Sequence, residues 1–202
     1  MSGVLCVCVY CGSRLGSLPA YEQAAAALGA AVGRRGWQLV YGGGGAGLMG
    51  RVADAALAAG AHVTGVIPES LMQREAGHRG LTELHVVKTM HDRKRLMADR
   101  ADAFVALPGG IGTFEELFEV WSWQHLGYHD RPIGLLDVAG YFAPMQAMLE
   151  GAVGAGFVTR AQMGMINVCA DPESLLDMMA AKKAANKATK KLSKKKPAAR
   201  GR

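Results

Sequence analysis

Residues 103–116, Ala-Phe-Val-Ala-Leu-Pro-Gly-Gly-Ile-Gly-Thr-Phe-Glu-Glu, hold the signal that decides the fold. The apolar run 103–107 predicts a buried parallel strand, and the apolar spacing in 117–121 predicts a helix after the glycines. Three glycines at a strand-to-helix junction let the backbone approach a ligand and aim free N–H groups at an anion. We expect Glu115 and Glu116 in the first helical turn, beside that anion site. The stretch therefore predicts chemistry on a phosphorylated substrate.

The segment Thr113–Glu116 also has a structural interpretation. T-x-x-E is the capping-box pattern of a helix N-terminus, in which Thr113 caps the helix. Because this helix start also lines the predicted crevice, we expect the cap to hold Glu116 beside the ligand. A carboxylate at that place is kept ionised by the helix dipole. It can orient a water or stabilise positive charge on a sugar ring, as carboxylates do in glycoside cleavage.

Predicted strands and helices alternate along the whole chain. Strands are predicted at 4–10, 37–41, 61–67, 84–87, 103–107, 133–137 and 165–169. Helices are predicted at 19–34, 90–100 and 141–155, after the second glycine loop to 59, after the 108–116 motif to 126, and from 172. This alternation predicts an α/β fold with a doubly wound parallel sheet, Rossmann-like, in three α/β/α layers. Such sheets bind ligands at the carboxyl ends of their strands, so both glycine-rich loops are expected to face one crevice.

The second glycine loop, 42–50, contains Gly45-Ala46-Gly47-Leu48-Met49-Gly50, which fits the dinucleotide pattern G-x-G-x-x-G. The acid that such a site needs about twenty residues later would be Glu69, which lies past the strand. The pattern also follows the second strand instead of the first. We therefore favour a single phosphate or a nucleoside monophosphate over hydride transfer with a dinucleotide.

The positive charge of the chain is concentrated at its C-terminus. The net charge is +6, but residues 182–202 contain ten Lys and Arg and no acid, which leaves 13 basic and 17 acidic residues, or −4, elsewhere. We predict one nucleotide-binding domain over 1–181 and a disordered Lys-rich tail over 182–202. The tail is either merely solvated or contacts nucleic acid or anionic membrane weakly. The net charge of the domain itself is negative, which disfavours contact with nucleic acid.

The remaining composition excludes several classes of site. No apolar run of 18 residues or signal-peptide pattern occurs, so we expect a cytoplasmic protein without membrane contact. Cys8 and Cys11 form C-x-x-C without a second pair, and Cys6 and Cys8 are expected in the core. His125 and His129 have no third ligand nearby. We expect neither a metal nor a cofactor.

The motifs together resemble those of the LOG ("Lonely Guy") phosphoribohydrolases, over residues 4–170. The matching segments are Pro108–Glu116, Met90-His91-x-Arg93-Lys94, Tyr10–Ser13, Tyr41–Gly44 with Gly47–Gly50, and Leu71-Met72-x-Arg74-Glu75. The resemblance implies hydrolysis of the N-glycosidic bond of N6-substituted adenosine 5′-monophosphates, or of AMP, to free base and ribose 5-phosphate. It also implies a homodimer.

The same resemblance assigns roles by position. Arg93 and Glu116 take the catalytic positions. The predicted substrate-binding residues are Ser13, Gly43, Gly44, Gly47, Glu75, Lys94, Gly109, Gly110, Ile111, Gly112, Thr113 and Glu115. Ile111 stands where the family often has Tyr, and Trp121-Ser122-Trp123 also departs from the plant pattern.

Two other functions compete with hydrolysis as interpretations of the motifs. Some relatives in this superfamily are labelled lysine decarboxylases, but no lysine stands at a recognisable Schiff-base position with an acid partner. A nucleotide-binding or sensor protein that uses the same phosphate site without turnover is the main alternative.

Overall fold

A computed structural model describes residues 4–73 and 76–195 of the chain, with side chains as far as Thr189. Within these residues a sheet of seven parallel strands has the order β4-β3-β2-β1-β5-β6-β7. The strands are β1 (Cys6–Tyr10), β2 (Gln38–Tyr41), β3 (His62–Pro68), β4 (Glu83–Val87), β5 (Ala103–Ala106), β6 (Ile133–Leu136) and β7 (Ile166–Cys169). The predicted doubly wound parallel sheet is confirmed.

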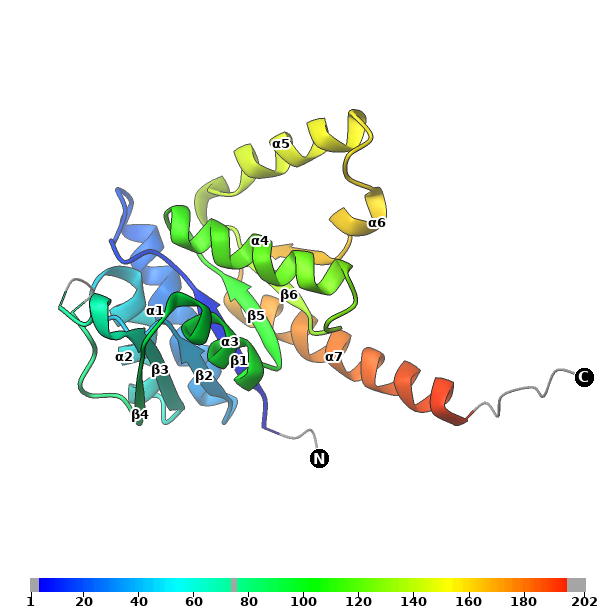
Figure 1. The fold of residues 1–202 in the computed structure, drawn as a ribbon. Coiled ribbons are helices and arrows are strands. Elements are labelled where there is room, and N and C mark those ends of the chain that lie inside the picture. Colours follow the sequence, from blue (N-terminus) through cyan, green and yellow to red (C-terminus); the bar gives the residue numbers. More distant parts are fainter. Residues whose placement is uncertain (1–3, 74–75, 196–202) are drawn as a thin grey trace, which may run out of the picture.

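Helices cover both faces of the sheet and complete three layers (Figure 1). One face packs against α1 (Pro19–Arg34), α2 (Gly47–Ala58) and α7 (Pro172–Lys195). The other face packs against α3 (Met90–Arg100), α4 (Ile111–His125) and α5 (Ala143–Gly154). Alternate residues of β1 enter the two cores, because successive strand side chains point to opposite faces.

Three short elements lie in segments that the apolar pattern did not resolve. They are the 3-10 helices η1 (Glu69–Leu71) and η2 (Val138–Gly140) and the one-turn helix α6 (Arg160–Met163). Helix α6 begins at a capping box between Thr159 and Gln162. Elements this short have too few apolar residues to show a period.

Strand β1 lies between β2 and β5, so the chain order reverses there. The β1 register pairs Val9 with both Tyr41 and Val105, which brings the three strand ends level. Chains leaving β1 and β5 must diverge toward opposite faces, which opens a crevice at the carboxyl ends of these strands. The two glycine-rich loops that follow β2 and β5 both start at this edge.

Helix α7 continues into the segment that the sequence predicts to be a disordered tail. It is helical to Lys195, and residues 196–202 lie outside the described part of the chain. Alanine and lysine both favour helix, and the buried first turns of α7 give the helix a start from which to extend. Within the described residues, no helix is long and apolar enough to cross a membrane.

Helices α1 and α2 pack at backbone distance, and Gly29 makes this possible. A Cβ atom at Gly29 would lie 2.2 Å from the Val52 carbonyl oxygen and 3.0 Å from the Ala56 nitrogen. We expect Gly29→Ala to lower the free energy of unfolding by about 1–3 kcal/mol, because the two helices must move apart.

Urea unfolding of Gly29→Ala and of Gly151→Ala tests this expectation. A Cβ atom at Gly151, inside α5, meets nothing within 4 Å, so the control is expected to gain up to about 1 kcal/mol from helix propensity. Equal stabilities of the two variants would contradict the close helix contact.

Candidate active site

A pocket of about 670 Å³ occupies the crevice between the carboxyl ends of β1 and β5. It is lined by the β1–α1 loop, Gly42 after β2, the starts of α3 and α4, and Tyr141. The lining residues are Val9 to Gly16, Tyr21, Gly42, Leu48, Met49, Leu71, Met90, Arg93, Pro108 to Thr113, Glu115, Glu116 and Tyr141. The crevice therefore lies where the sequence predicted it.

Helix α4 starts earlier than the capping-box pattern predicts. Gly110 is the N-cap in extended conformation, no side chain caps the helix, and Ile111 is its first residue. Thr113 therefore lies inside the first turn, where it is 4% exposed. Glu115 and Glu116 fall beyond the first turn, in which no acid occurs. The predictions of a Thr113 cap and of two first-turn acids are wrong, because the glycines let the backbone enter the helix directly.

The early start of α4 points its N-terminus into the pocket. The first intrahelical hydrogen bond runs from the Phe114 N–H to the Gly110 carbonyl oxygen, over 3.2 Å. The N–H groups of Ile111, Gly112 and Thr113 precede it and have no acceptor within their own helix. A Cβ atom at Gly112 would meet nothing within 4 Å. Three N–H groups without an acceptor in their own helix, on residues that line the pocket, are suited to a phosphate.

Gly109 lies at the point where the loops that follow β1 and β5 cross. A Cβ atom there would lie 2.1 Å from Thr113 Oγ1 and 2.8 Å from the Gly12 nitrogen. The Gly12 N–H donates to the Pro108 carbonyl oxygen over 3.1 Å. Gly109 is thus required by packing, whereas Gly110 and Gly112 leave room for a ligand.

Arg93 is positioned by the backbone at the ends of β2 and β3. Its Nη2 donates to the Gly42 carbonyl oxygen over 2.7 Å, and its Nε donates to the Val66 carbonyl oxygen over 3.1 Å. The residue is 5% exposed yet lines the pocket. A Cβ atom at Gly42 would lie 2.1 Å from Nη2, so glycine at position 42 makes room for the guanidinium. The site therefore has a cation whose position is set by the fold.

Lys94 lies behind the pocket lining and supports Glu115. Its Nζ donates to Glu115 Oε1 over 2.5 Å and to Glu119 Oε1 over 2.9 Å. Burial lowers the pKa of Lys94, but the hydrogen bonds to the two carboxylates outweigh burial and raise it above the ordinary value. The amine therefore stays protonated. A protonated lysine holds a neighbouring acid in place and does not act as an imine-forming nucleophile.

Glu116 contributes negative charge to the wall of the pocket near β1. The pKa of Cys11 is raised well above its usual value, first by burial and then by the charge of Glu116. The pKa values of Cys8 and Tyr10 are also raised, mainly by burial, and Glu116 adds to each. The thiols therefore stay neutral near pH 7, which excludes a thiolate nucleophile at Cys11. Glu116 is then an acid of the lining suited to stabilise positive charge.

Most of the second glycine loop packs against protein instead of lining the pocket. The Gly43 carbonyl oxygen accepts from the His78 N–H, the Gly45 N–H donates to the Ala76 carbonyl oxygen, and Gly44 forms a bridge with Gly77. Gly47 has a φ of 61°, and a Cβ atom there would lie 2.3 Å from the Ser13 carbonyl carbon. Only Gly42 of this glycine run lines the pocket.

The predicted substrate residues therefore divide into groups. Those in the lining are Ser13, Gly109, Gly110, Ile111, Gly112, Thr113 and Glu115, together with the predicted catalytic pair Arg93 and Glu116. Gly43, Gly44, Gly47 and Lys94 lie outside the lining. Glu75 falls outside the described residues.

Tyr141 is a lining residue that the sequence analysis missed. Its hydroxyl donates to the Gly109 carbonyl oxygen, and its ring stacks on Phe114 at 6.2 Å. Tyr21, also missed, meets the Tyr141 ring edge-on at 5.8 Å. Tyr141 follows β6 and η2, so no local motif links it to residues 108–116. The one signal in the sequence for Tyr141 is its position after a strand, at the edge of the sheet where ligands bind.

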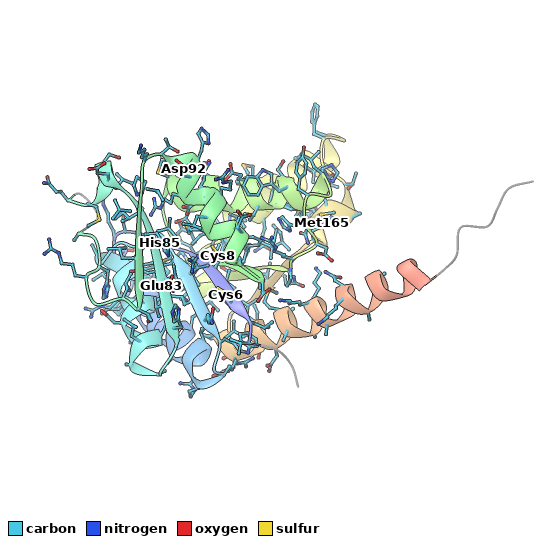
Figure 2. All side chains as sticks on the ribbon, turned by 60° about the horizontal axis from the view of Figure 1, so that its bottom comes forward. Cys6, Cys8, Glu83, His85, Asp92 and Met165 are labelled. Carbon is cyan, nitrogen blue, oxygen red and sulfur yellow. The ribbon has the colours of Figure 1, made fainter. Side chains whose placement is uncertain are left out.

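The histidines and cysteines hold other positions. His129 Nε2 contacts the Val120 carbonyl oxygen at 2.9 Å, while Nδ1 accepts from the Arg131 N–H. Cys6 and Cys8 lie along β1 (Figure 2), and Cys8 and Cys11 belong to opposite cores. The prediction that Cys6 and Cys8 share one core face is confirmed. Among the described residues, no group of three His, Cys, Asp or Glu is arranged to hold a metal.

Comparison with known proteins gives one family. The family described as "Possible lysine decarboxylase" matches residues 49–179. A cytokinin riboside 5′-monophosphate phosphoribohydrolase of Rhodococcoides fascians is 50% identical over 171 residues, which cover 84% of this chain and 86% of that protein. The enzyme LOG of Oryza sativa, with the same name, is 51% identical over 152 residues, or 75% of this chain and 63% of that protein.

Solved structures resemble this fold at lower identity. A molybdenum cofactor binding protein from Rippkaea orientalis has a TM-score of 0.67 at 18% identity, and covers 90% of this chain and 98% of its own. The Moco carrier protein of Chlamydomonas reinhardtii has a TM-score of 0.67 at 20% identity, with 91% and 99% covered. At this identity the likeness shows the fold alone.

We expect Tyr141→Phe to weaken binding of AMP by about threefold to tenfold, because one hydrogen bond that fixes Gly109 is lost. Calorimetric titration measures the affinity, and urea unfolding checks that the variant remains folded. Tyr128→Phe, at an exposed position (77%), is the matched control. Unchanged affinity in Tyr141→Phe would show that the hydroxyl does not position the loop.

Proposed function

Because the chain belongs to the LOG family of cytokinin riboside 5′-monophosphate phosphoribohydrolases, we propose that it hydrolyses the N-glycosidic bond of adenosine 5′-monophosphates, N6-substituted or not. One observation carries the mechanism. Arg93 and Glu116 line the same pocket as the N-terminus of α4. A phosphorylated ribose requires an anion site for its phosphate at one end and an acid beside its anomeric carbon at the other. A fixed cation adds to the binding of the phosphate or the ribose.

The phosphate binds at the N-terminus of α4. Ile111, Gly112 and Thr113 line the pocket there, and the dipole of the 15-residue helix favours an anion. Ser13, from the loop after β1, also lines this pocket and supplies a hydroxyl donor. Gly43, Gly44 and Gly47 then contribute by holding Gly42 and the β1–α1 loop in place.

Glu116 acts on the sugar. Cleavage breaks the bond between the anomeric carbon and the base nitrogen, and leaves positive charge on the ribose ring. The Glu116 carboxylate stabilises this oxocarbenium-like state and orients a water for attack. The water oxygen bonds to the anomeric carbon and keeps one proton as the new hydroxyl group, while the other proton of the water passes to the nitrogen of the departing base. The products are free base and ribose 5-phosphate.

Arg93, which lines the same pocket, also binds the substrate. With two guanidinium nitrogens held by backbone carbonyls, it does not need to reorganise when the substrate enters. Lys94 keeps Glu115 at the rim through their 2.5 Å contact and is a positioning residue. Glu75, on the segment after η1, contacts sugar or base in this proposal.

The base lies toward the apolar part of the lining. Leu15, Leu71, Met90 and Ile111 supply that part, and Ile111 is 87% exposed. When an aliphatic N6 substituent packs against such side chains, its apolar surface is removed from water, which favours binding. Both plain AMP and N6-substituted nucleotides are therefore substrates in this proposal.

Decarboxylation of lysine, which the family description suggests, is not supported by the site. Among the described residues, none of those that line the pocket is a lysine. Lys94, which lies just behind, is held protonated by Glu115 and Glu119. A Schiff base with pyridoxal phosphate needs a neutral amine at the site.

We further propose that two copies associate and that the protein acts in the cytoplasm. All four cysteines are free thiols, as is usual in a reducing compartment. Exposed apolar side chains occur around α4 and α5, which is the expected composition of an interface. They are Ile111 (87%), Leu126 (60%), Tyr128 (77%), Met148 (59%) and Phe157 (85%).

Hydrolysis is tested by incubating the protein with AMP and with isopentenyl-AMP in the presence of EDTA, and measuring free base by chromatography. We expect Glu116→Gln to bind both nucleotides while kcat falls by about 10²–10⁴-fold. Glu150→Gln, on α5 away from the pocket, is the control and should retain full turnover.

The alternative function makes the opposite prediction in that assay. Tight binding of both nucleotides by the unaltered protein without base release would identify a nucleotide-binding or sensor protein. Full turnover by Glu116→Gln would leave hydrolysis intact and remove Glu116 from the mechanism.

Association is tested by sedimentation velocity. Met148→Glu with Phe157→Glu places charges in the apolar surface, and we expect the mass to fall from that of two chains to that of one. Val4→Glu, at an exposed position (62%) before β1, is the control and should leave the mass unchanged. A single-chain mass for the unaltered protein would contradict association.

A further inference from the structure

The basic part of α7 is unexplained by nucleotide hydrolysis. The helix begins with buried Leu175, Leu176 and Met179 against the sheet, and its acids Glu173 and Asp177 pair with Arg35, the residue after α1. No acid follows Asp177 in the sequence, whereas ten Lys and Arg occur in residues 182–202. The charge along α7 therefore changes from balanced to entirely positive at about the point where it leaves the core.

Hydrogen bonds and an ion pair hold the middle of α7 against the body of the protein. Lys182 Nζ donates to the Met165 carbonyl oxygen over 3.1 Å, and Lys183 pairs with Asp102 just before β5. Asn186 Nδ2 donates to the Asp130 carbonyl oxygen over 2.5 Å. These contacts hold the helix as far as residue 186. They use two of the ten basic residues, which leaves eight in residues 187–202.

Beyond Asn186 the helix projects from the body (Figures 1 and 2). Lys187, Ala188 and Thr189 are all exposed. Lys187, Lys190, Lys191 and Lys194 follow at the spacing i, i+3, i+4 and i+7, which places them on one side of a helix. Like charges at this spacing repel one another and destabilise a helix. Binding of a polyanion relieves this repulsion and therefore stabilises the helical segment.

We propose that α7 from Lys187 onward is a contact surface for the sugar–phosphate backbone of nucleic acid. A helix is about 10–12 Å wide, which matches the roughly 12 Å major groove of a duplex. The cations are nearly all lysines, which act as point charges on phosphates, and the described part of this segment has no Arg, Asn or Gln for base edges. Binding is therefore independent of base sequence.

An anionic membrane is a poorer partner for the same helix. A helix that lies in a membrane interface needs large apolar residues opposite its lysines. In residues 187–202, Leu192 is the one large aliphatic residue and no aromatic residue occurs. The surface therefore offers charge without an apolar side to bury.

This surface lies on the side of the sheet away from the pocket. Asp102 and Asp130, which contact α7, precede β5 and β6, so α7 leaves the body at the amino ends of the strands. The pocket lies at their carboxyl ends. Nucleic acid on α7 therefore leaves the pocket accessible, and nucleotide hydrolysis should continue unchanged.

The experiment uses the full chain and fluorescence anisotropy with a labelled 30-base-pair DNA duplex and a single-stranded RNA, between 50 and 300 mM NaCl. We expect both to bind at 50 mM. The slope of log K against log salt should be about −4 to −7, since each neutralised phosphate contributes roughly 0.7–0.9. Two unrelated duplex sequences should differ by less than about twofold.

The test variant changes Lys187, Lys190, Lys191 and Lys194 to Gln. We expect at least a tenfold loss of affinity at 100 mM NaCl and a slope less steep by about 3–4. The control changes four exposed cations of the body, Arg51, Lys88, Arg95 and Arg160, to Gln, which alters the net charge equally. It should lose less than threefold. Base release from AMP should be the same in both variants.

Three results would overturn the proposal. One is no binding of either nucleic acid at 50 mM NaCl, and another is an equal loss of affinity in the control variant. The third is binding to vesicles of one-third phosphatidylserine that is tighter than binding to the duplex.

Discussion

The contact between the loops that follow β1 and β5 is the constraint on which the site depends. The Leu107 N–H donates to the Tyr10 carbonyl oxygen over 2.9 Å, and the Gly12 N–H donates to the Pro108 carbonyl oxygen over 3.1 Å. These bonds continue the pairing of the two strands past their ends, until Gly109 crosses against Gly12 with no room for a Cβ atom. The chains then separate to α1 and α4. The pocket is the space that this separation opens, and the N-terminus of α4 is aimed into it for the same reason.

The charged groups around that pocket are positioned by backbone and buried partners. Arg93 is held by carbonyl oxygens at the ends of two strands, and Lys94 by two carboxylates of α4. Burying a cation is costly unless hydrogen bonds replace its water, and these contacts supply the replacement. The side chains therefore need little reorganisation when a nucleotide enters. At the opposite edge of the sheet, the C-terminal part of α7 extends away from the body (Figure 1). In the two proposals above, the site for a nucleotide phosphate and the contact surface for nucleic acid therefore lie at opposite edges of the sheet.

The fold was predictable because parallel strands and amphipathic helices can be recognised from the local spacing of apolar residues. Bounds of α1 and α3 agree with the prediction to the residue, and the bounds of the strands and of α5 agree within two residues. Helix α7, in contrast, continues to Lys195, past the predicted end of the domain at 181. The start of α4 was predicted wrongly from a real pattern. Thr113 and Glu116 have capping-box spacing, but the neighbouring glycines allow Gly110 to be the N-cap. In this case backbone freedom outweighed side-chain capping, which is worth only about 1 kcal/mol.

The sequence alone determined the sheet, the ligand edge and the residues of the β5–α4 loop, since each depends on neighbours in the chain. Arg93, which the resemblance to a family places in a catalytic position, lines the same pocket as that loop. Only the tertiary structure decided which glycines face the ligand and which face protein. Gly43, Gly44 and Gly47 look like Gly110 and Gly112 in sequence, yet they pack against the 76–78 segment and the β1–α1 loop. Tyr141 reaches Gly109 from 32 residues away. Contacts between residues that far apart depend on how helices and strands pack, and no local spacing encodes them.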